Sequence, residues 1–223
     1  MLDLATATGL AAEAALALVE PGGHVTAADL SPAMIERARK RLGMRPDVAL
    51  AVEDGQALSF ADASFDAVLC SMGLMFFPDP ARGLAEFRRV LRHGGRAAAS
   101  VNTVPERSFA ARVNIAIGRH VPELAEAAAR VFSLADEARL RSLFGAAGFR
   151  DVDITTEAHR FALPSFDAYF EPIERGGGST GEAYAALPKE ARHAVREEVR
   201  SDLGDQGGPI EVDVEIRFAS GGR

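Results

Sequence analysis

The stretch HVTAADLSPAMIERARKRL, residues 24–42, decides the fold that we expect for this chain. It opens with a short β-type run that ends at Asp29, and a helix start follows, with Ser31 as the capping residue and Pro32 at the first helical position. A strand that leads directly into a capped helix is the repeating unit of proteins in which helices cover a parallel sheet. We therefore expect a strand at 24–29 and a helix at 32–42.

The same alternation of strand and helix extends to both sides of this stretch. A second capped helix, at 80–91, begins after Asp79, and the HGG of residues 93–95 is expected to end it before a further strand. The other elements expected in the first half are strands at 2–5, 47–54, 65–70 and 96–101 and a helix at 10–20. This order predicts an α/β fold with a Rossmann-like, doubly wound and mostly parallel sheet that carries helices on both faces.

The second half of the sequence is less regular. Residues 112–130 have a helical pattern that Pro122 interrupts, and residues 136–149 have an amphipathic pattern that Gly148 closes. The remaining segments expected here are a strand at 151–157, helical stretches within 165–201 that the glycine-rich residues 175–181 separate, and a strand at 209–220. We interpret the chain as a single domain, residues 1–223, in which residues 103–130 and 165–208 are lid or cap insertions.

The composition is that of an ordinary globular protein and argues against several classes of function. The formal net charge is −7 and the arginines lie among acidic residues, whereas a nucleic-acid partner requires clustered basic residues. No apolar run reaches the roughly 18 residues that span a membrane, so no membrane partner is expected. The single cysteine, Cys70, rules out an internal disulfide, and the N-terminus lacks a secretory pattern, so we expect a cytoplasmic protein.

Four short motifs follow the expected strands in order. They are DLATATG at residues 3–9, Asp29 at the end of the second strand, the pair Asp54-Gly55 after the third, and EFRRVLRHGGR at residues 86–96. With SFDAVLCSMGLMFFPDP, residues 64–80, they resemble the class I S-adenosylmethionine-dependent methyltransferases, in the type 11 branch that includes ubiquinone and menaquinone biosynthesis enzymes. The resemblance covers residues 1–101 well, and it implies methyl transfer from S-adenosylmethionine to a small-molecule acceptor.

The residue types at these motifs also suit such a cofactor on physical grounds. A strand-to-helix turn of small residues lets the backbone approach a ligand, and the N-terminus of the next helix offers free N–H groups to a carboxylate. A carboxylate at the tip of the second strand lies where doubly wound sheets bind a ribose diol, which assigns that role to Asp29. Asp54, at the tip of the third strand, is placed to accept a hydrogen bond from the exocyclic amine of adenine, as the resemblance also implies.

Each assignment has a structural alternative. Asp29 could cap the following helix, although Ser31 is better placed for that role, and Asp54 could lie in a solvated turn. Asp3 could hold the loop backbone instead of touching a ligand. The residues expected to bind the cofactor are Asp3, Ala5, Ala7, Gly9, Asp29, Leu30, Asp54, Gly55, Gln56 and Ser71.

The residues after the fourth expected strand are candidates for an acceptor pocket. Met75, Phe76 and Phe77 form an apolar cluster that would either floor this pocket or pack within the domain. Methyl transfer from a sulfonium depends mainly on alignment in a dry site and needs no metal. If the acceptor must lose a proton, His120 in the expected lid is the candidate base among the five histidines.

Two features depart from the family pattern. Ala7 replaces a usual glycine, and if this position needs a positive φ an alanine costs on the order of 1 kcal/mol, whereas Ala5 is an ordinary variant. The family's one or two helices before the first strand are expected to be absent, because Met1 lies within that strand. Either the reading frame is truncated or the pocket is open on that side.

Other classes of function compete with methyl transfer. The altered loop would also suit a degenerate protein that binds S-adenosylmethionine without catalysis or serves as a scaffold. A nicotinamide-dependent oxidoreductase is disfavoured because no G-x-G-x-x-G follows the first expected strand. The partner that we expect is a small, partly apolar acceptor, and a homodimer is left open.

Overall fold

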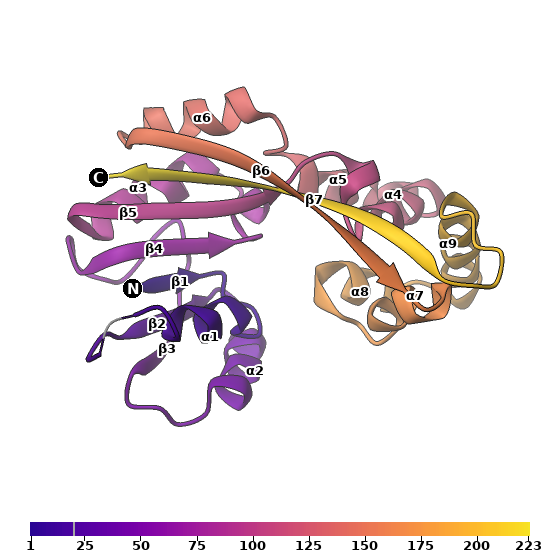
Figure 1. The fold of residues 1–223 in the computed structure, drawn as a ribbon, viewed down its shortest axis with the longest axis horizontal. Coiled ribbons are helices and arrows are strands. Elements are labelled where there is room, and N and C mark those ends of the chain that lie inside the picture. Colours follow the sequence, from indigo (N-terminus) through magenta and orange to yellow (C-terminus); the bar gives the residue numbers. More distant parts are fainter. Residues whose placement is uncertain (20) are drawn as a thin grey trace. The chain divides into compact units, whose positions relative to one another are not determined.

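The protein is described by a computed structural model, which covers residues 1–19 and 21–223. The chain divides into two compact units. The first comprises Met1–Val101, Asp136–Thr155 and Arg217–Arg223, and the second comprises Asn102–Ala135 and Thr156–Ile216. Two long strands, β6 (Arg150–Leu163) and β7 (Ile210–Gly222), each begin in one unit and end in the other (Figure 1). The segments 103–130 and 165–208 belong to the second unit, and their role as a lid stays a prediction.

The described residues form a seven-stranded sheet in the order β3-β2-β1-β4-β5-β7-β6. The strands that pair in parallel are β1 (Leu2–Leu4), β2 (Val25–Asp29), β3 (Val48–Val52), β4 (Phe65–Ser71) and β5 (Leu91–Asn102). Strand β7 runs in the opposite direction (Figure 1). The strand order reverses between β1 and β4, and open α/β sheets bind ligands at such a switch point. The predicted α/β class and doubly wound, mostly parallel sheet are confirmed.

The helices of the first unit pack in two pairs. Helix α1 (Leu10–Leu16) contacts α2 (Pro32–Leu42), and α3 (Pro80–Val90) contacts α6 (Glu137–Ala146). Crossover connections between parallel strands are right-handed. The reversal of the strand order therefore places α1 and α2 on one face of the sheet and α3 on the other.

Capping side chains fix where α2 and α3 begin. The hydroxyl of Ser31 accepts a hydrogen bond from the backbone N–H of Met34 at 3.4 Å, and the carboxylate of Asp79 accepts one from Arg82 at 3.1 Å. Both predicted caps are thus confirmed. Beneath α1 and α2, apolar side chains from helix and strand form one buried cluster, in which each fully buried Val or Leu contributes about 1.5–3 kcal/mol. Its members are Ala12, Ala15, Val25, Ala27, Ala38 and Leu42.

Two boundaries in the first unit differ from the prediction. Helix α1 ends at Leu16, whereas the sequence pattern extended it to residue 20, and Glu20 lies outside the described residues. The HGG of residues 93–95 does not separate α3 from the next strand, because β5 begins directly after α3 and includes these residues. The register shifts there, and a Cβ on Gly95 would lie 2.8 Å from a backbone oxygen of β4. The glycines therefore permit a bulge at close approach to β4.

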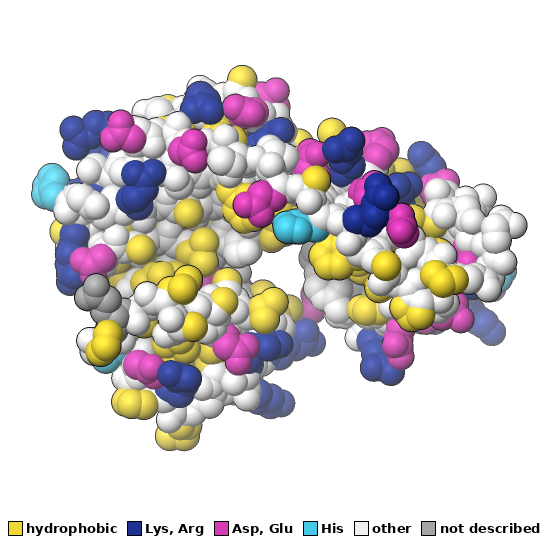
Figure 2. Space-filling model, in the orientation of Figure 1, with side chains coloured by type: hydrophobic (Ala, Val, Ile, Leu, Met, Phe, Trp, Pro, Cys, Tyr) yellow, Lys and Arg dark blue, Asp and Glu magenta, His cyan; other side chains and the backbone are white. Residues whose placement is uncertain are grey.

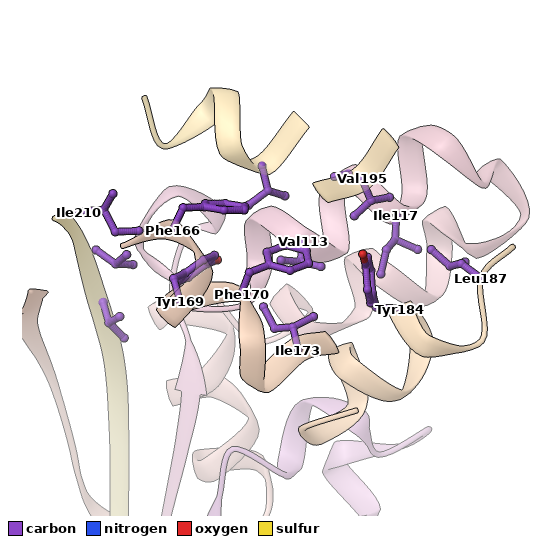
Figure 3. Close-up of a cluster of buried hydrophobic side chains, with 14 residues drawn as sticks. Val113, Ile117, Phe166, Tyr169, Phe170, Ile173, Tyr184, Leu187, Val195 and Ile210 are labelled. Carbon is purple, nitrogen blue, oxygen red and sulfur yellow. The ribbon is translucent and has the colours of Figure 1, made fainter. Parts of the chain in front are cut away.

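The second unit has a helical core of its own. Its helices are α4 (Ala111–His120), α5 (Ala125–Ala129), α7 (Phe166–Glu174), α8 (Gly178–Ala185) and α9 (Lys189–Asp202). Aromatic side chains of α7 and α8 pack against Val113 and Ile117 of α4 (Figure 3). The largest of them are Phe166, Tyr169, Phe170 and Tyr184. The predicted break at Pro122 is confirmed, since a 3-10 turn, Pro122–Leu124, separates α4 from α5.

The predicted glycine-rich break between α7 and α8 is shorter than expected. Residues 175–181 were expected to be irregular, but α8 already begins at Gly178. A Cβ on Gly181 would lie 2.6 Å from the carbonyl carbon of Gly176 and 2.9 Å from the carbonyl oxygen of Ile173. Gly181 is therefore part of a close helix contact between α8 and the end of α7. Gly181 is thus needed for helix packing. A glycine-rich composition alone does not show whether a segment packs in this way or forms a flexible linker.

Candidate functional site

The carboxyl ends of β1, β2, β3 and β4 meet at one edge of the sheet in the first unit. The parallel register pairs Leu4 of β1 with Ala28 of β2, and Asp29 with Val52 of β3. The segments that leave these strands therefore begin side by side. The residues predicted to bind the cofactor lie on these segments or, for Asp3, Asp29 and Ser71, within the strands themselves, so the structure brings that set to one edge, next to the switch point.

The turn after β1 is built on left-handed backbone. Ala5 has a φ of 56° and Ala7 a φ of 49°, a region in which an L-residue costs roughly 1–2 kcal/mol. The sequence analysis raised a cost of positive φ for Ala7 only, and the structure shows that Ala5 also has a positive φ. Gly9 has a φ of 82°, and a Cβ there would lie 3.2 Å from Leu42 on α2. Gly9 thus serves the approach of α1 to α2 as well as the turn.

A second left-handed residue stands at the end of β4. Met72 has a φ of 54°, and its N–H donates to the carbonyl oxygen of Ser100 at 3.0 Å and to the hydroxyl of the same residue at 3.1 Å. The hydroxyls of Ser71 and Ser100 lie 3.3 Å apart. A Cβ on Gly73 would lie 2.5 Å from the Cβ of Ala5. The turns after β1 and β4 therefore fit together through the missing side chain of Gly73.

Asp3 lies beneath the turn after β1 and is fully buried. Its Oδ2 accepts a hydrogen bond from the hydroxyl of Thr6 at 2.5 Å, while its Oδ1 is buried without a partner. Burial raises the pKa of Asp3 to about 6, and the hydrogen bonds from Thr6 and from the backbone of Ala12 offset part of this effect. The contact with Thr6 ties Asp3 to the turn from within, and a contact of Asp3 with a ligand stays a prediction.

Asp29 ties the turn after β1 to the start of α2. One carboxylate oxygen accepts the N–H of Ala7 at 2.8 Å, and the other accepts the N–H of Ser31 at 2.9 Å. The cap of α2 is Ser31, so Asp29 is not needed for that role. A carboxylate oxygen accepts two hydrogen bonds, and each oxygen of Asp29 therefore keeps one acceptor position. Leu30, the next residue, is 69% exposed.

Asp54 is exposed at the end of β3, where it shapes a tight turn. Its Oδ1 accepts the backbone N–H of Gln56 at 2.9 Å. Gly55 between them is buried against Phe77, and a Cβ there would overlap the aromatic ring. The side chain of Gln56 accepts the N–H of Asp79 at 2.7 Å, so it is engaged with the start of α3.

The three residues predicted to line an acceptor pocket have different environments. Met75 is buried, and Phe77 packs edge-on against Phe87 with ring centroids 6.2 Å apart. A Cβ on Gly83 would lie 2.5 Å from the ring of Phe77. Met75 and Phe77 thus pack against their neighbours, Phe76 is 40% exposed, and a role of the three in an acceptor pocket stays a prediction.

The candidate base His120 lies at the end of α4, in the second unit. Its Nε2 is 2.8 Å from one oxygen of Glu198, and Arg119 donates to the other oxygen at 2.6 Å. A role of His120 as a base stays a prediction. Cys70 is buried, and burial raises its pKa to about 12, so its thiol is inert.

Other kinds of site are not found in the described part of the chain. Within residues 1–19 and 21–223, His, Cys, Asp and Glu side chains form no cluster of three that could hold a metal ion. In the same residues, every helix is too short or too polar to cross a membrane.

The sequence missed several residues that shape this edge. Thr6 and Ser100 act through hydroxyl groups on neighbouring elements, and a single sequence gives no signal for such contacts. Glu86 and Arg89 fasten the segment after β3 to α3. Their i, i+3 spacing in EFRRVL predicts a pair on one helix face, but it does not predict what the pair binds.

Comparison with known proteins finds a family match within the first unit. Residues 2–99, which are less than half of the chain, match the family described as methyltransferase domain, type 11. A demethylmenaquinone methyltransferase from Clavibacter sepedonicus is 45% identical over 96 residues, which cover 43% of this chain and 38% of that protein. The chain spans about two fifths of the length of the first curated relatives that it matches. The resemblance inferred from the motifs is confirmed for this segment.

Solved structures share the fold at low sequence identity. Phosphoethanolamine N-methyltransferase 2 from Haemonchus contortus, in complex with phosphomonomethylethanolamine and S-adenosylhomocysteine, has a TM-score of 0.63 at 18% identity, over 100% of this chain and 48% of that one. The [4+2]-cyclase SpnF has a TM-score of 0.57 at 16% identity, over 98% of this chain and 73% of that one. Because a cyclase shares the fold, the fold does not by itself determine the reaction.

Proposed function

We propose that this chain, whose residues 2–99 belong to the type 11 methyltransferase domain family, transfers a methyl group from S-adenosylmethionine to a small-molecule acceptor. The observation that carries the proposal is the pair of carboxylates, Asp29 and Asp54, at the ends of adjacent parallel strands beside the left-handed turn after β1. The name of the C. sepedonicus relative, demethylmenaquinone methyltransferase, supports the same class of reaction.

The residues at this edge fit the nucleoside of the donor. Asp29 keeps one free acceptor position on each carboxylate oxygen, which matches the two hydroxyls of a ribose diol. Asp54 is exposed and uses one oxygen in its own turn, so the other is available to the exocyclic amine of adenine. The exposed side chain of Leu30 offers apolar surface to the adenine ring.

The turn at residues 5–9 is the part of the site that we assign to the methionine portion of the donor. Its side chains are small, so the backbone is accessible to a ligand, and Asp3 and Thr6 stabilise its shape from beneath. The donor brings a methyl group on a positively charged sulfur. The protein's contribution is to fix the nucleoside through Asp29 and Asp54 and to keep water from the reacting atoms, since alignment alone lowers the barrier substantially.

A small acceptor agrees with the surface of the protein. The formal net charge is −7, and acidic and basic side chains are interspersed on the face drawn in Figure 2. A macromolecular acceptor such as RNA would favour clustered basic residues. We therefore propose a small organic acceptor, of the kind that the name of the C. sepedonicus relative indicates.

A second candidate function is donor binding without methyl transfer. It is favoured by Ala7, whose exposed methyl group stands where the family usually has a glycine and whose N–H is already bonded to Asp29. A turn that satisfies its own backbone in this way offers one donor fewer to a ligand.

Calorimetric titration with S-adenosylhomocysteine, followed by a turnover assay with S-adenosylmethionine and a demethylated quinol, tests both functions. We expect binding that Asp29→Ala weakens about tenfold, since the variant removes hydrogen bonds to a charged group. Asp66→Ala, which removes an exposed carboxylate from the other end of the strand that precedes Met72, is the matched control and should bind normally. Absence of binding at millimolar ligand would overturn both proposals, and binding without turnover on any small acceptor would favour the second.

A further inference from the structure

The segment that carries Asp54, residues 53–63, is fastened to α3 by one arginine. Arg89 donates from Nη2 to the carbonyl oxygen of Leu58 at 2.9 Å and from Nη1 to that of Phe60 at 2.8 Å. The planar guanidinium thus bonds two backbone carbonyls that lie two residues apart. A lysine, with one compact ammonium group, does not reproduce this fork.

Glu86, one turn earlier on α3, completes the contact. Its carboxylate accepts Nε and Nη2 of Arg89 at 2.7 and 2.8 Å, and it also accepts the backbone N–H of Leu58 at 2.8 Å. The hydrogen bonds with Arg89 hold the pKa of Glu86 below its usual range, and the same bonds raise the pKa of Arg89. The side chains are only 18% and 30% exposed, so solvent screens this pair less than an ordinary surface pair. We call Glu86 and Arg89 the α3 clamp.

The same helix region also holds the other end of the segment, where it leaves β3. The side-chain oxygen of Gln56 accepts the backbone N–H of Asp79 at 2.7 Å, and the backbone carbonyl oxygen of Gln56 accepts a hydrogen bond from Nε of Arg82 at 2.8 Å. Gly55 rests directly on the ring of Phe77. The turn that presents Asp54 is therefore fixed at Gln56 and at Leu58 by groups on or next to α3.

We propose that the α3 clamp positions Asp54 for adenine recognition, so that Glu86 and Arg89 are positioning residues for donor selectivity. The inference rests on the proposed function, in which Asp54 accepts the exocyclic amine of adenine. Its physical basis is preorganisation, because a segment that is already ordered loses little conformational entropy when the ligand binds. Without the clamp, only the contacts at Gly55 and Gln56 would hold the turn, the ligand would have to supply part of the ordering of Asp54, and discrimination between purines would fall.

The test compares two ligands that differ at one group on the purine ring. S-inosylhomocysteine carries an oxygen where S-adenosylhomocysteine carries the amine, so the ratio of their dissociation constants reports on the contact with Asp54. We expect the wild-type chain to prefer the adenosyl ligand roughly tenfold or more, because the carboxylate of Asp54 accepts a hydrogen bond from the amine and meets only another acceptor in the oxygen. Arg89→Met and Glu86→Gln should reduce this preference to about threefold or less. Asp54→Ala combined with either variant should show little further loss.

Arg45→Met is the matched control, because the pair of Arg45 with Asp47 lies before β3, at the opposite end of that strand from Asp54. Its preference should equal that of the wild type. Glu86→Gln, which keeps the shape of the side chain, decides the question if Arg89→Met does not fold. If the wild-type chain binds neither ligand, the proposed function fails. If it binds with a clear preference and Glu86→Gln or a folded Arg89→Met keeps that preference, the proposed function stands and the inference about the clamp is wrong.

Discussion

Replacing the buried Asp3 by asparagine should change how the stability of the first unit depends on pH. Burial raises the pKa of Asp3 to about 6 from 3.8, because the charged form loses its hydration and Oδ1 has no partner. Since the native state binds the proton more tightly than the unfolded state, the contribution of Asp3 to stability is fully present below about pH 4. It is lost progressively as the pH rises through about 6, and it stays lost above that value.

The size of this effect follows from the two pKa values. A shift of about two units at roughly 1.4 kcal/mol per unit corresponds to about 3 kcal/mol. The free energy of unfolding of Asp3→Asn, minus that of the wild type, should therefore rise by roughly 2.5 kcal/mol between pH 4 and pH 7, the remainder of the effect lying outside this range. The asparagine has no charge to bury in this range, whereas the wild type ionises a carboxyl group that has little solvent.

Urea denaturation at a series of pH values measures this difference, and carbon-13 NMR of the Asp3 carboxyl group measures the pKa directly. Asp66→Asn is the control of opposite sign, since its hydrogen bond with Arg92 lowers the pKa of Asp66. The contribution of Asp66 to stability is present above the pKa of the unfolded state, and it is lost as the pH falls through the lower pKa of the folded state. A titration midpoint of the Asp3 carboxyl group below about pH 4.5 would refute the reasoning. So would a difference in the free energy of unfolding between Asp3→Asn and the wild type that stays constant from pH 4 to pH 7.

Three further substitutions test how the edge of the sheet is held. Gly73→Ala should lower the free energy of unfolding by about 1–3 kcal/mol in urea denaturation, because the new Cβ would lie 2.5 Å from the Cβ of Ala5. Adding Ala5→Gly to this variant should recover part of the loss. If Gly73→Ala costs the same with Ala5 and with Gly at position 5, the contact is contradicted. Ala7→Gly should leave the free energy of unfolding nearly unchanged, because the relief of roughly 1 kcal/mol of backbone strain is offset by the greater freedom of glycine in the unfolded chain. The same variant should bind S-adenosylhomocysteine several-fold more tightly in calorimetry. Ala63→Gly, at a left-handed position outside this edge, is its control and should not change affinity, and unchanged affinity for Ala7→Gly would show that the methyl group of Ala7 is neutral. Ser100→Ala should lower the free energy of unfolding by about 1 kcal/mol and, by loosening Met72, also lower the affinity for the donor. Ser64→Ala, which removes a hydroxyl bonded in the turn before β4, is the control and should lower stability alone. Equal donor affinities of the two variants would contradict the role of Ser100.

The sequence predicted the parts of the fold that depend on local pattern. The caps at Ser31 and Asp79 and the alternation of strand and helix follow from short-range chemistry, and the structure has them in the predicted places. Asp29 and Asp54 were placed at neighbouring strand ends because parallel strands end at a common edge. The register of the sheet confirms that placement, while their ligand roles stay proposals.

What the sequence could not give are the contacts between segments far apart in the chain. Arg89 bonds carbonyl groups about 30 residues before it, and Ser100 fixes Met72 from the neighbouring strand. Phe77 has the same apolar character as a pocket residue, and only the closeness of Gly55 shows that it packs inside. A helical or strand period predicts which face of an element is buried, but it does not identify the partner.

Backbone strain gives an independent reason to place the functional site at this edge. Of the non-glycine residues with positive φ among residues 1–19 and 21–223, Ala5, Ala7 and Met72 lie at the carboxyl ends of β1 and β4. Three such residues cost roughly 3 kcal/mol or more in total, a large fraction of the stability of an ordinary domain. Glycine would remove much of this cost at each position, and no requirement of packing prevents it at the exposed Ala7.

The strain persists because specific contacts hold each of these residues. The N–H of Ala7 is bonded to Asp29, that of Met72 is bonded to Ser100, and the methyl group of Ala5 fits against Gly73. Contacts that enforce an unfavourable backbone are typical of positions where geometry matters more than stability, such as ligand sites. The same contacts join the turn after β1 to β2 and to the turn after β4. A ligand that binds at this edge would therefore meet a surface whose shape is already set before it arrives.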